Sequence, residues 1–156
     1  MSQLENRTYD ELNLGDTASI THLVTERDLT LFAAVSGDTN PVHLDEAFAA
    51  ATPFKGRIAH GMFSGALISA AVACEMPGPG TIYIGQEMSF MRPVRLGDEI
   101  RVELEILEKL PKNRLKIATR VFNQDNKQVV DGVATVMAPT EKVSIERPNV
   151  PKVTIG

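Results

Sequence analysis

The chain has 156 residues and one cysteine, and its formal net charge is −4 at pH 7. A chain of this length fits one domain that can bury a substantial core without disulfides. With 43% hydrophobic and 23% charged residues, it has the balance of an ordered globular protein. The negative charge argues against a general nucleic-acid binder, because that function needs a basic face.

No repeat or linker divides the sequence. We therefore expect one domain over residues 1–140, with residues 141–156 as its C-terminal tail, lying along the surface or along a partner. Residues 1–10 are polar, so no secretory signal is expected. The longest apolar stretch, residues 62–74, is too short to cross a bilayer. These features predict a cytoplasmic protein with no membrane contact.

The first third of the chain predicts a strand followed by a helix. Residues 17–24 suit a strand. Thr25 is a good helix N-cap, and acidic residues occupy the first turn after it. Apolar residues then follow at helical spacing until Gly37, which ends the helix. A loop over residues 38–43 and a short helix near residues 45–51 complete this region.

Residues 61–74 read GMFSGALISAAVAC and carry no charge on any face. A helix that is apolar all round is expected to be buried on every side. At its ordinary rise per residue, such a helix would be about 21 Å long. Its many small side chains would let other backbone segments approach closely.

The second half of the chain predicts strands. Apolar and charged residues alternate over residues 100–106, a period of two that is typical of a half-buried strand. Further strands are expected over residues 81–90, 115–121 and 129–138, with short turns between them, so the sheet is antiparallel. One apolar helix with such a sheet predicts an α+β protein of the hot-dog type, in which the sheet wraps around a central buried helix.

Three polar residues, Asp38, Asn40 and His43, follow one another closely in a loop bounded by Gly37 and Pro41. Gly37 permits a tight chain reversal, and Pro41 stiffens the loop. The three side chains can converge on one small molecule. The competing interpretation is a helix cap at Asp38 with His43 filling a polar gap. A metal site is disfavoured, because no second cluster of His or Cys accompanies these ligands.

A second candidate feature is the segment of residues 58–62, IAHGM, which leads directly into the apolar helix. The start of a helix presents free backbone N–H groups and the positive end of the helix dipole. Gly61 has no side chain, so a ligand oxygen can approach its N–H closely, as an oxyanion hole for a thioester carbonyl requires. The alternatives are an ordinary buried helix start, and a core histidine at His60 whose hydrogen bonds are satisfied.

These segments together resemble one known family. The run FAAVSGDTNPVH over residues 32–43, with Ala49 beyond it, resembles the hydratase-2 motif of MaoC-like enzymes. Three later runs resemble the same family in the same order: IAHGM at 58–62, PGPGTIYIGQ at 77–86 and RPVRLGDEI at 92–100. The similarity is greatest to the short, single-domain (R)-specific enoyl-CoA hydratases that feed polyhydroxyalkanoate synthesis. Hot-dog thioesterases generally lack this motif.

The resemblance implies a reaction and a set of roles. The substrate would be a trans-2-enoyl-CoA and the product an (R)-3-hydroxyacyl-CoA, formed by syn addition of water with no metal or redox cofactor. Asp38 and His43 would hold the water. Asp38 as the base with His43 as its partner is the working assignment, and the reverse assignment fits the sequence equally well. Asn40 would hold the pair or the thioester in place, and the Gly61 N–H would stabilise the enolate oxygen. The family forms its CoA site between subunits, so a homodimer is expected.

Substrate-binding residues are less sharply indicated. One face of the apolar helix has the spacing to line an acyl tunnel, or only to pack against the sheet; beyond Gly61 it carries Gly65, Ser69 and Val72. Three basic residues are candidates for the CoA phosphates or are solvated surface charges: Arg92, Arg95 and Lys116. The family preference indicates short acyl chains.

Three rival functions fit parts of this pattern. A 3-hydroxyacyl-carrier-protein dehydratase shares the fold and runs the reverse chemistry on a protein carrier. A hot-dog acyl-CoA thioesterase would release free thiol, although the intact polar motif speaks against it. A non-catalytic acyl-CoA-binding module would bind the thioester without turnover.

Overall fold

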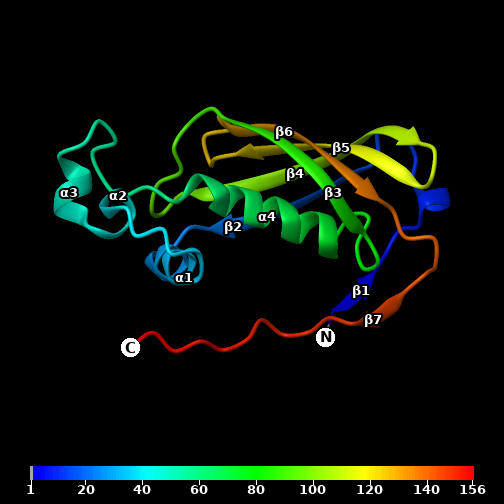
Figure 1. Cartoon of the computed structure of the whole chain (residues 1–156), viewed down its shortest axis with the longest axis horizontal. Coiled ribbons are helices and arrows are strands. Elements are labelled where there is room, and N and C mark those ends of the chain that lie inside the picture. The colour runs from blue at the N-terminus through cyan, green and yellow to red at the C-terminus, as the bar shows by residue number, and fades with distance from the viewer. Residues whose placement is uncertain (1) are drawn as a thin grey trace.

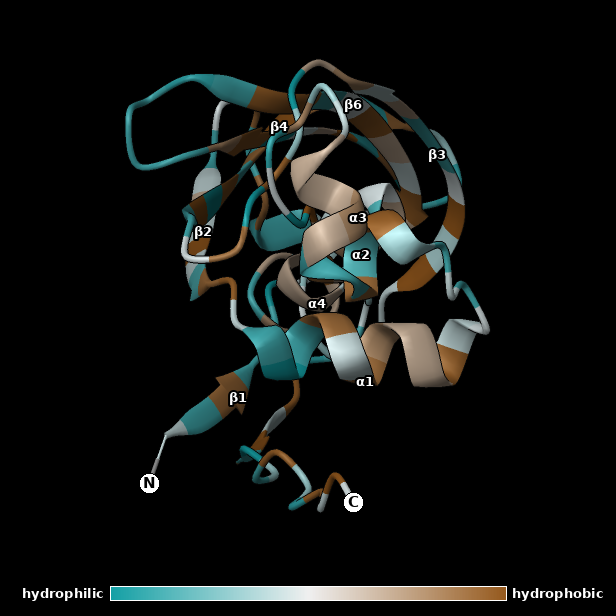
Figure 2. Cartoon of the chain, turned by 90° about the vertical axis from the view of Figure 1, so that its left-hand side faces the viewer, coloured by the Kyte–Doolittle hydropathy of each residue, from teal (hydrophilic) through white to brown (hydrophobic). Residues whose placement is uncertain are grey.

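The computed structural model describes residues 2–156, and its centre is a five-stranded antiparallel sheet with spatial order β2-β4-β5-β6-β3. The sheet curls over one long helix, α4 (Gly61–Cys74), as Figures 1 and 2 show from two directions. The strands are β2 (Thr17–Leu23), β3 (Ile82–Phe90), β4 (Glu99–Leu110), β5 (Arg114–Phe122) and β6 (Gln128–Met137). The predicted α+β hot-dog fold is confirmed.

The core lies between the curled sheet and α4. In β4 the buried and partly exposed residues alternate, as the period of two predicted, so that one face of the strand packs inward. The inward residues of β4 are Ile100, Val102, Leu104 and Ile106. From the helix, Ile68 and Val72 are buried against them. Each such aliphatic side chain contributes about 1.5–3 kcal/mol on burial.

Three short helices join β2 to α4: α1 (Glu26–Ser36), α2 (Pro41–Leu44) and α3 (Glu46–Ala50). Thr25 caps α1 with its side chain, and Gly37 ends it in the left-handed region at φ 76°, both as predicted. The prediction of a loop over residues 38–43 is wrong for its second half, because α2 begins at Pro41. Pro41 suits the first helical position, where no N–H is needed.

The expectation that α4 is buried on every side is wrong for the single chain. Met62 is 56% exposed, and the side chains of Ala66, Ser69 and Ala70 are also open to solvent. The physical reason is that five strands curl over only part of the helix surface. The remaining apolar face has no cover within residues 2–156.

The first part of the C-terminal segment forms regular structure, although the sequence predicted only a tail there. Residues Ser144–Glu146 form β7, which pairs antiparallel with β1 (Gln3–Glu5) to make a small second sheet. Beyond it, residues 147–156 form no regular element and extend along the molecule (Figure 1). Within residues 2–156, no helix combines the length and hydropathy needed to span a membrane.

The tight packing of the sheet at Gly132 of β6 gives a first prediction. A Cβ at this position would clash with the Glu87 carbonyl oxygen of β3 and lie 2.9 Å from Thr119 Oγ1 of β5. Because the Glu87 oxygen belongs to the backbone, this clash can be relieved only if the strands shift. We expect Gly132→Ala to lower the free energy of unfolding by about 3 kcal/mol, measured by urea denaturation at fixed protein concentration.

The matched control is Gly56→Ala, where an added Cβ makes only an ordinary contact, 3.5 Å from Glu46 Oε1. Its effect is expected to stay within about 0.5 kcal/mol. Equal stabilities for the two variants would contradict the packing argument at Gly132.

Candidate active site

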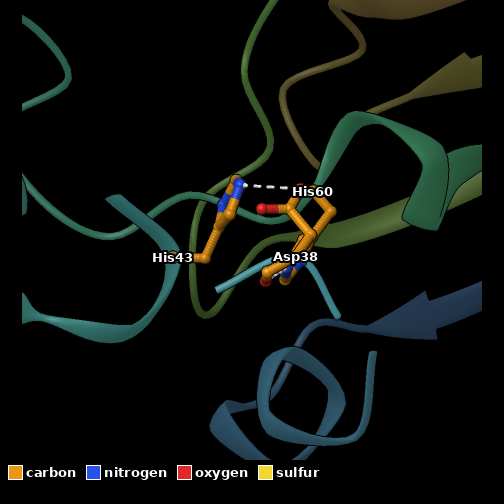
Figure 3. Close-up of side chains that lie close together, drawn as sticks. All are labelled: Asp38, His43 and His60. Atoms are coloured by element: carbon orange, nitrogen blue, oxygen red, sulfur yellow. Dashed lines mark hydrogen bonds and ion pairs between the residues drawn. The ribbon is translucent and has the colours of Figure 1, made fainter. Parts of the chain in front are cut away.

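Asp38 and His43 meet at the junction between α1 and α2. The left-handed Gly37 turns the chain out of α1, and Asn40 starts α2 two residues after Asp38. His43 Nε2 then lies 3.8 Å from Asp38 Oδ2 (Figure 3). The His43 side chain is 9% exposed, whereas that of Asp38 is 49% exposed. One partner is therefore held inside the protein and the other stands at its edge.

Hydrogen bonds to backbone carbonyls fix the His43 ring. His43 Nδ1 lies 2.8 Å from the Ile58 carbonyl oxygen. A carbonyl only accepts, so Nδ1 carries the hydrogen, and the neutral ring presents a bare Nε2 toward Asp38. The backbone of His43 is also held, because Arg57 Nε donates to its carbonyl at 2.7 Å. Arg57 is in turn paired with Glu26 Oε1 at 3.0 Å.

The Asp38 carboxylate is held through its other oxygen. Asp38 Oδ1 accepts the Asn40 backbone N–H at 3.2 Å, which leaves Oδ2 toward His43. Asn40 uses its own side-chain oxygen to accept the Val42 N–H at 3.2 Å, as the N-cap of α2. Asn40 thus shapes the loop that carries the pair. Its amide oxygen is engaged in this cap.

Gly61 opens α4 beside the same gap. It lines a cavity of about 350 Å³ whose other wall comes from the segment that follows β3. Gly61 approaches the ring of Phe90, since a Cβ added there would lie 3.3 Å from that ring. The lining is mostly apolar and includes His43, Gly61, Ser64, Phe90, Val94 and Val129. The cavity therefore brings the imidazole and the start of a helix together in an environment suited to an acyl chain.

His60, the residue before Gly61, is part of this cluster as well. Its ring stacks on that of His43 at 3.8 Å between centroids, with 23° between the planes. His60 Nε2 lies 3.0 Å from the Asp38 carbonyl oxygen, and its Nδ1 is buried with no partner within residues 2–156. The sequence interpretation of His60 as a core histidine with satisfied hydrogen bonds is therefore only half right.

The cluster is poorly arranged for a metal ion, although one ligand atom from each of Asp38, His43 and His60 lies within 4.8 Å of the others. Imidazole lone pairs lie in the ring planes, and two stacked rings direct them along nearly parallel planes. The lone pairs therefore do not converge on one point. Each ring also has one nitrogen facing a backbone carbonyl.

The proposed acyl-binding residues lie along α4, outside the cavity lining. Val72 is buried in the core, Ser69 is exposed, and Gly65 lies against the methionine side chains of Met62 and Met88.

The three basic residues predicted to contact the CoA phosphates lie in different places. Arg92 lines the cavity, whereas Arg95 lies in an adjoining surface hollow and donates to the Phe54 carbonyl. Lys116 is on β5, paired in register with Glu108 and Thr135, away from both.

Two neighbours of the pair were not predicted as site residues, although the sequence interpretation had considered His60 as a core histidine. Arg57 has a side chain that is only 9% exposed, and His60 contacts both members of the pair. Nothing in the sequence around Arg57 indicated that its side chain is buried. For His60, the only signal was its place immediately before the helix start.

The chain is similar to known proteins along nearly its whole length. The family model described as "MaoC like domain" matches residues 11–137. The crystal structure of R-hydratase PhaJ1 from Pseudomonas aeruginosa, in the unliganded form, superposes with a TM-score of 0.96 at 64% identity, covering 99% of this chain and 100% of that one. The (R)-hydratase from Aeromonas caviae involved in PHA biosynthesis superposes with a TM-score of 0.80 at 40% identity, covering 82% of this chain and 98% of that one.

A further curated relative is the (R)-specific enoyl-CoA hydratase of Rhodospirillum rubrum. It is 39% identical over 131 residues, which are 84% of this chain and 91% of the relative. Family, structure and curated relatives agree along nearly the whole chain. This chain therefore belongs to the MaoC-like family, in its branch of (R)-specific enoyl-CoA hydratases.

Proposed function

We propose that this chain hydrates short trans-2-enoyl-CoA thioesters to (R)-3-hydroxyacyl-CoA, the precursor of polyhydroxyalkanoate. The observation that carries the proposal is the Asp38–His43 pair, 3.8 Å apart, in which His43 lines an apolar cavity together with Gly61 at the N-terminus of α4. These parts match the needs of the reaction: a held water, a proton relay and a stabilised thioester oxygen.

The pair is suited to hold one water molecule between two acceptors. An ionised Asp38 offers Oδ2, and neutral His43 offers its bare Nε2. At 3.8 Å the two atoms leave room for a water oxygen at about 2.8 Å from each, donating one hydrogen to each. Its lone pairs then point away from both acceptors, toward a substrate β-carbon in the cavity.

The hydrogen bond to Ile58 favours His43 as the group that moves the proton. Imidazole is a stronger base than a carboxylate, and its Nε2 is free while Nδ1–H is held by the carbonyl. As the water oxygen bonds to the β-carbon, Nε2 takes a water proton, and the Asp38 carboxylate stabilises the imidazolium. Nε2–H then returns a proton to the α-carbon from the same side, which gives syn addition and restores neutral His43.

Negative charge develops on the thioester oxygen between these two steps. The N–H of the first residue of a helix has no partner inside the helix, and Gly61 presents this N–H without a side chain in the way. A carbonyl oxygen at this point receives a hydrogen bond and the favourable field of the helix dipole. The Gly61 N–H is therefore the proposed oxyanion donor.

The cavity is consistent with a short acyl chain. Its volume of about 350 Å³ is enclosed mostly by apolar side chains, and Arg92 stands among the lining residues as the one cation. Arg92 also lines the adjoining hollow that contains Arg95 and Lys127. The CoA phosphates would lie at this end, so Arg92 is the best supported of the three basic residues proposed above.

We also propose that the protein works as a homodimer. Strand β3 ends the sheet, and its outer edge has no partner strand within residues 2–156. This edge carries exposed apolar side chains, among them Ile82, Ile84 and Phe90. It adjoins the exposed face of α4, since Gly61 and Gly65 lie against Phe90 and Met88. A second copy placed by two-fold symmetry would cover both surfaces at once.

The reaction is tested by following loss of the enoyl-thioester absorbance of crotonyl-CoA. We expect the wild type to turn over, and Asp38→Asn and His43→Gln each to lower kcat on the order of 100- to 10,000-fold while remaining folded. The matched control, Glu46→Gln, removes an exposed carboxylate nearby and should keep full activity. An (R)-specific 3-hydroxyacyl-CoA dehydrogenase reads the product.

Formation of the (S) product, or activity only on acyl-carrier-protein thioesters, would contradict the proposal. So would release of free CoA thiol, the sign of a thioesterase. A wild type that binds crotonyl-CoA without turnover would indicate a binding module.

Two variants at Gly61 test its proposed role as the oxyanion donor. Gly61 is the first helical residue, a position that accepts proline, and the preceding His60 is extended at ψ 138°. Gly61→Pro removes the N–H, whereas Gly61→Ala keeps it and only crowds Phe90. We expect Gly61→Pro to lower kcat on the order of 100- to 1,000-fold and Gly61→Ala to lower it far less. Equal losses would indicate crowding instead.

The dimer is tested at the edge of β3. Ile84 is 45% exposed on this strand, and a charge there opposes edge-to-edge pairing. We expect the wild type to sediment as a dimer and Ile84→Asp as a monomer in analytical ultracentrifugation. The control is Leu14→Asp, which changes a 64% exposed leucine outside the sheet and should leave the dimer intact. A monomeric wild type would contradict the proposal.

A further inference from the structure

We propose that His60 is a positioning residue of the reaction, which holds Asp38 and His43 in place relative to each other. The inference rests on the proposed hydration, because it assigns a role within that same site. His60 is 2% exposed and gathers with the pair in Figure 3. Neither the water-holding step nor the oxyanion step above uses its side chain.

The first contact of His60 is with the backbone of Asp38. His60 Nε2 lies 3.0 Å from the Asp38 carbonyl oxygen, so Nε2 must carry the hydrogen and donate it. Asp38 directly follows the left-handed Gly37, where the chain leaves α1. The half-exposed carboxylate of Asp38 is otherwise carried by a short loop. The hydrogen bond ties that loop to the residue that precedes α4.

The second contact is with the His43 ring. The hydrogen bond from Nδ1 to Ile58 is one restraint on this ring, and a rotation of the ring about its Cβ–Cγ bond would break it. Such rotation would swing Nε2 away from Asp38 Oδ2. The stacked ring of His60, 3.8 Å away between centroids, blocks this movement on one face. Phe32 of α1 packs against His60 in turn, with 5.0 Å between centroids.

The environment of His60 requires it to act as a neutral ring. With Nε2–H donated to a carbonyl, the remaining Nδ1 is a buried acceptor that has no partner among residues 2–156. A proton on Nδ1 would add a buried charge and an unsatisfied donor, which is costly. His60 is therefore no proton relay: it acts through the placement of Asp38 Oδ2 and His43 Nε2.

Two variants of the full-length protein separate the two contacts. His60→Phe keeps a stacked ring and loses the donor, whereas His60→Gln keeps a donor and loses the ring. We expect each to lower kcat for crotonyl-CoA about 10- to 100-fold, with KM changed less than about threefold, because a displacement of roughly 1 Å in such a pair can cost about 100-fold. His22→Gln, at a half-buried histidine outside the site, is the control and should keep wild-type kcat.

A readout independent of turnover is the tautomer of His43, from long-range proton–nitrogen NMR spectra. The signal is assigned by its loss in His43→Gln, and the protein has only three histidines. We expect the Nδ1–H form in the wild type and in His60→Phe. In His60→Gln we expect a shift toward the tautomer mixture of a free imidazole, because the ring can turn. This measurement stands even if crotonyl-CoA is not the substrate.

Three results would overturn the proposal. The first is wild-type kcat in both His60 variants. The second is a loss confined to KM, which would make His60 a substrate contact. The third is a fall in thermal stability of both variants with kcat per folded molecule and the His43 tautomer unchanged, which would make His60 merely structural.

Discussion

The geometry of the site depends on one segment of four residues, 57–60, that connects the loop of α3 to the start of α4. Its carbonyl at Ile58 holds the His43 ring, and Ile58 also bridges to Arg95 beyond the cavity. Ala59 donates its N–H to the Val94 carbonyl at 2.7 Å. The segment is thus fixed to the body of the protein before it presents any group to the substrate. Because Gly61 follows the segment directly, the orientation of the imidazole and the position of the helix N-terminus are set together.

This arrangement explains how a half-exposed carboxylate can serve in a defined pair. Asp38 alone is a half-exposed residue on a loop, and its Oδ2 lies 3.8 Å from the neutral His43 ring, which is too far for a direct hydrogen bond. The position of Asp38 is fixed by two hydrogen bonds. The Asn40 backbone N–H donates to Asp38 Oδ1, and His60 Nε2 donates to the Asp38 carbonyl oxygen. Both hydrogen bonds form within the protein itself and need no substrate. Preorganisation therefore costs the reaction little when the substrate arrives.

Much of the fold and the central pair could be predicted from the sequence, because local chemistry determines both. Alternation over residues 100–106 identified the inward face of β4, and Thr25 and Gly37 marked the ends of α1. The closeness of Asp38 and His43 followed from a short loop. The features that were missed depend on contacts distant in sequence: Ile58 reaching back to His43, and His60 reaching back to Asp38.

The error over α4 has a different origin. Periodicity reports which faces of a helix are apolar, but it does not report which chain covers them. The uncharged sequence of α4 correctly indicated a helix with no solvent-adapted face, yet one curled sheet covers only part of it. The β7 strand was missed for a related reason, since three residues pair only because β1 from the opposite end of the chain lies beside them.

The uncovered surface and the reaction site are physically continuous, and this bears on how the enzyme is assembled. Phe90 is 54% exposed at the end of the edge strand β3, lines the cavity, and lies against Gly61, where the helix begins. A subunit that packs on β3 would therefore also change the wall of the cavity and shield the oxyanion position from water. Exclusion of water strengthens the hydrogen bond to a developing charge. Assembly and catalysis would then be linked through one aromatic side chain: any change that loosens the packing of Phe90 would weaken the stabilisation of the thioester oxygen as well as the subunit contact.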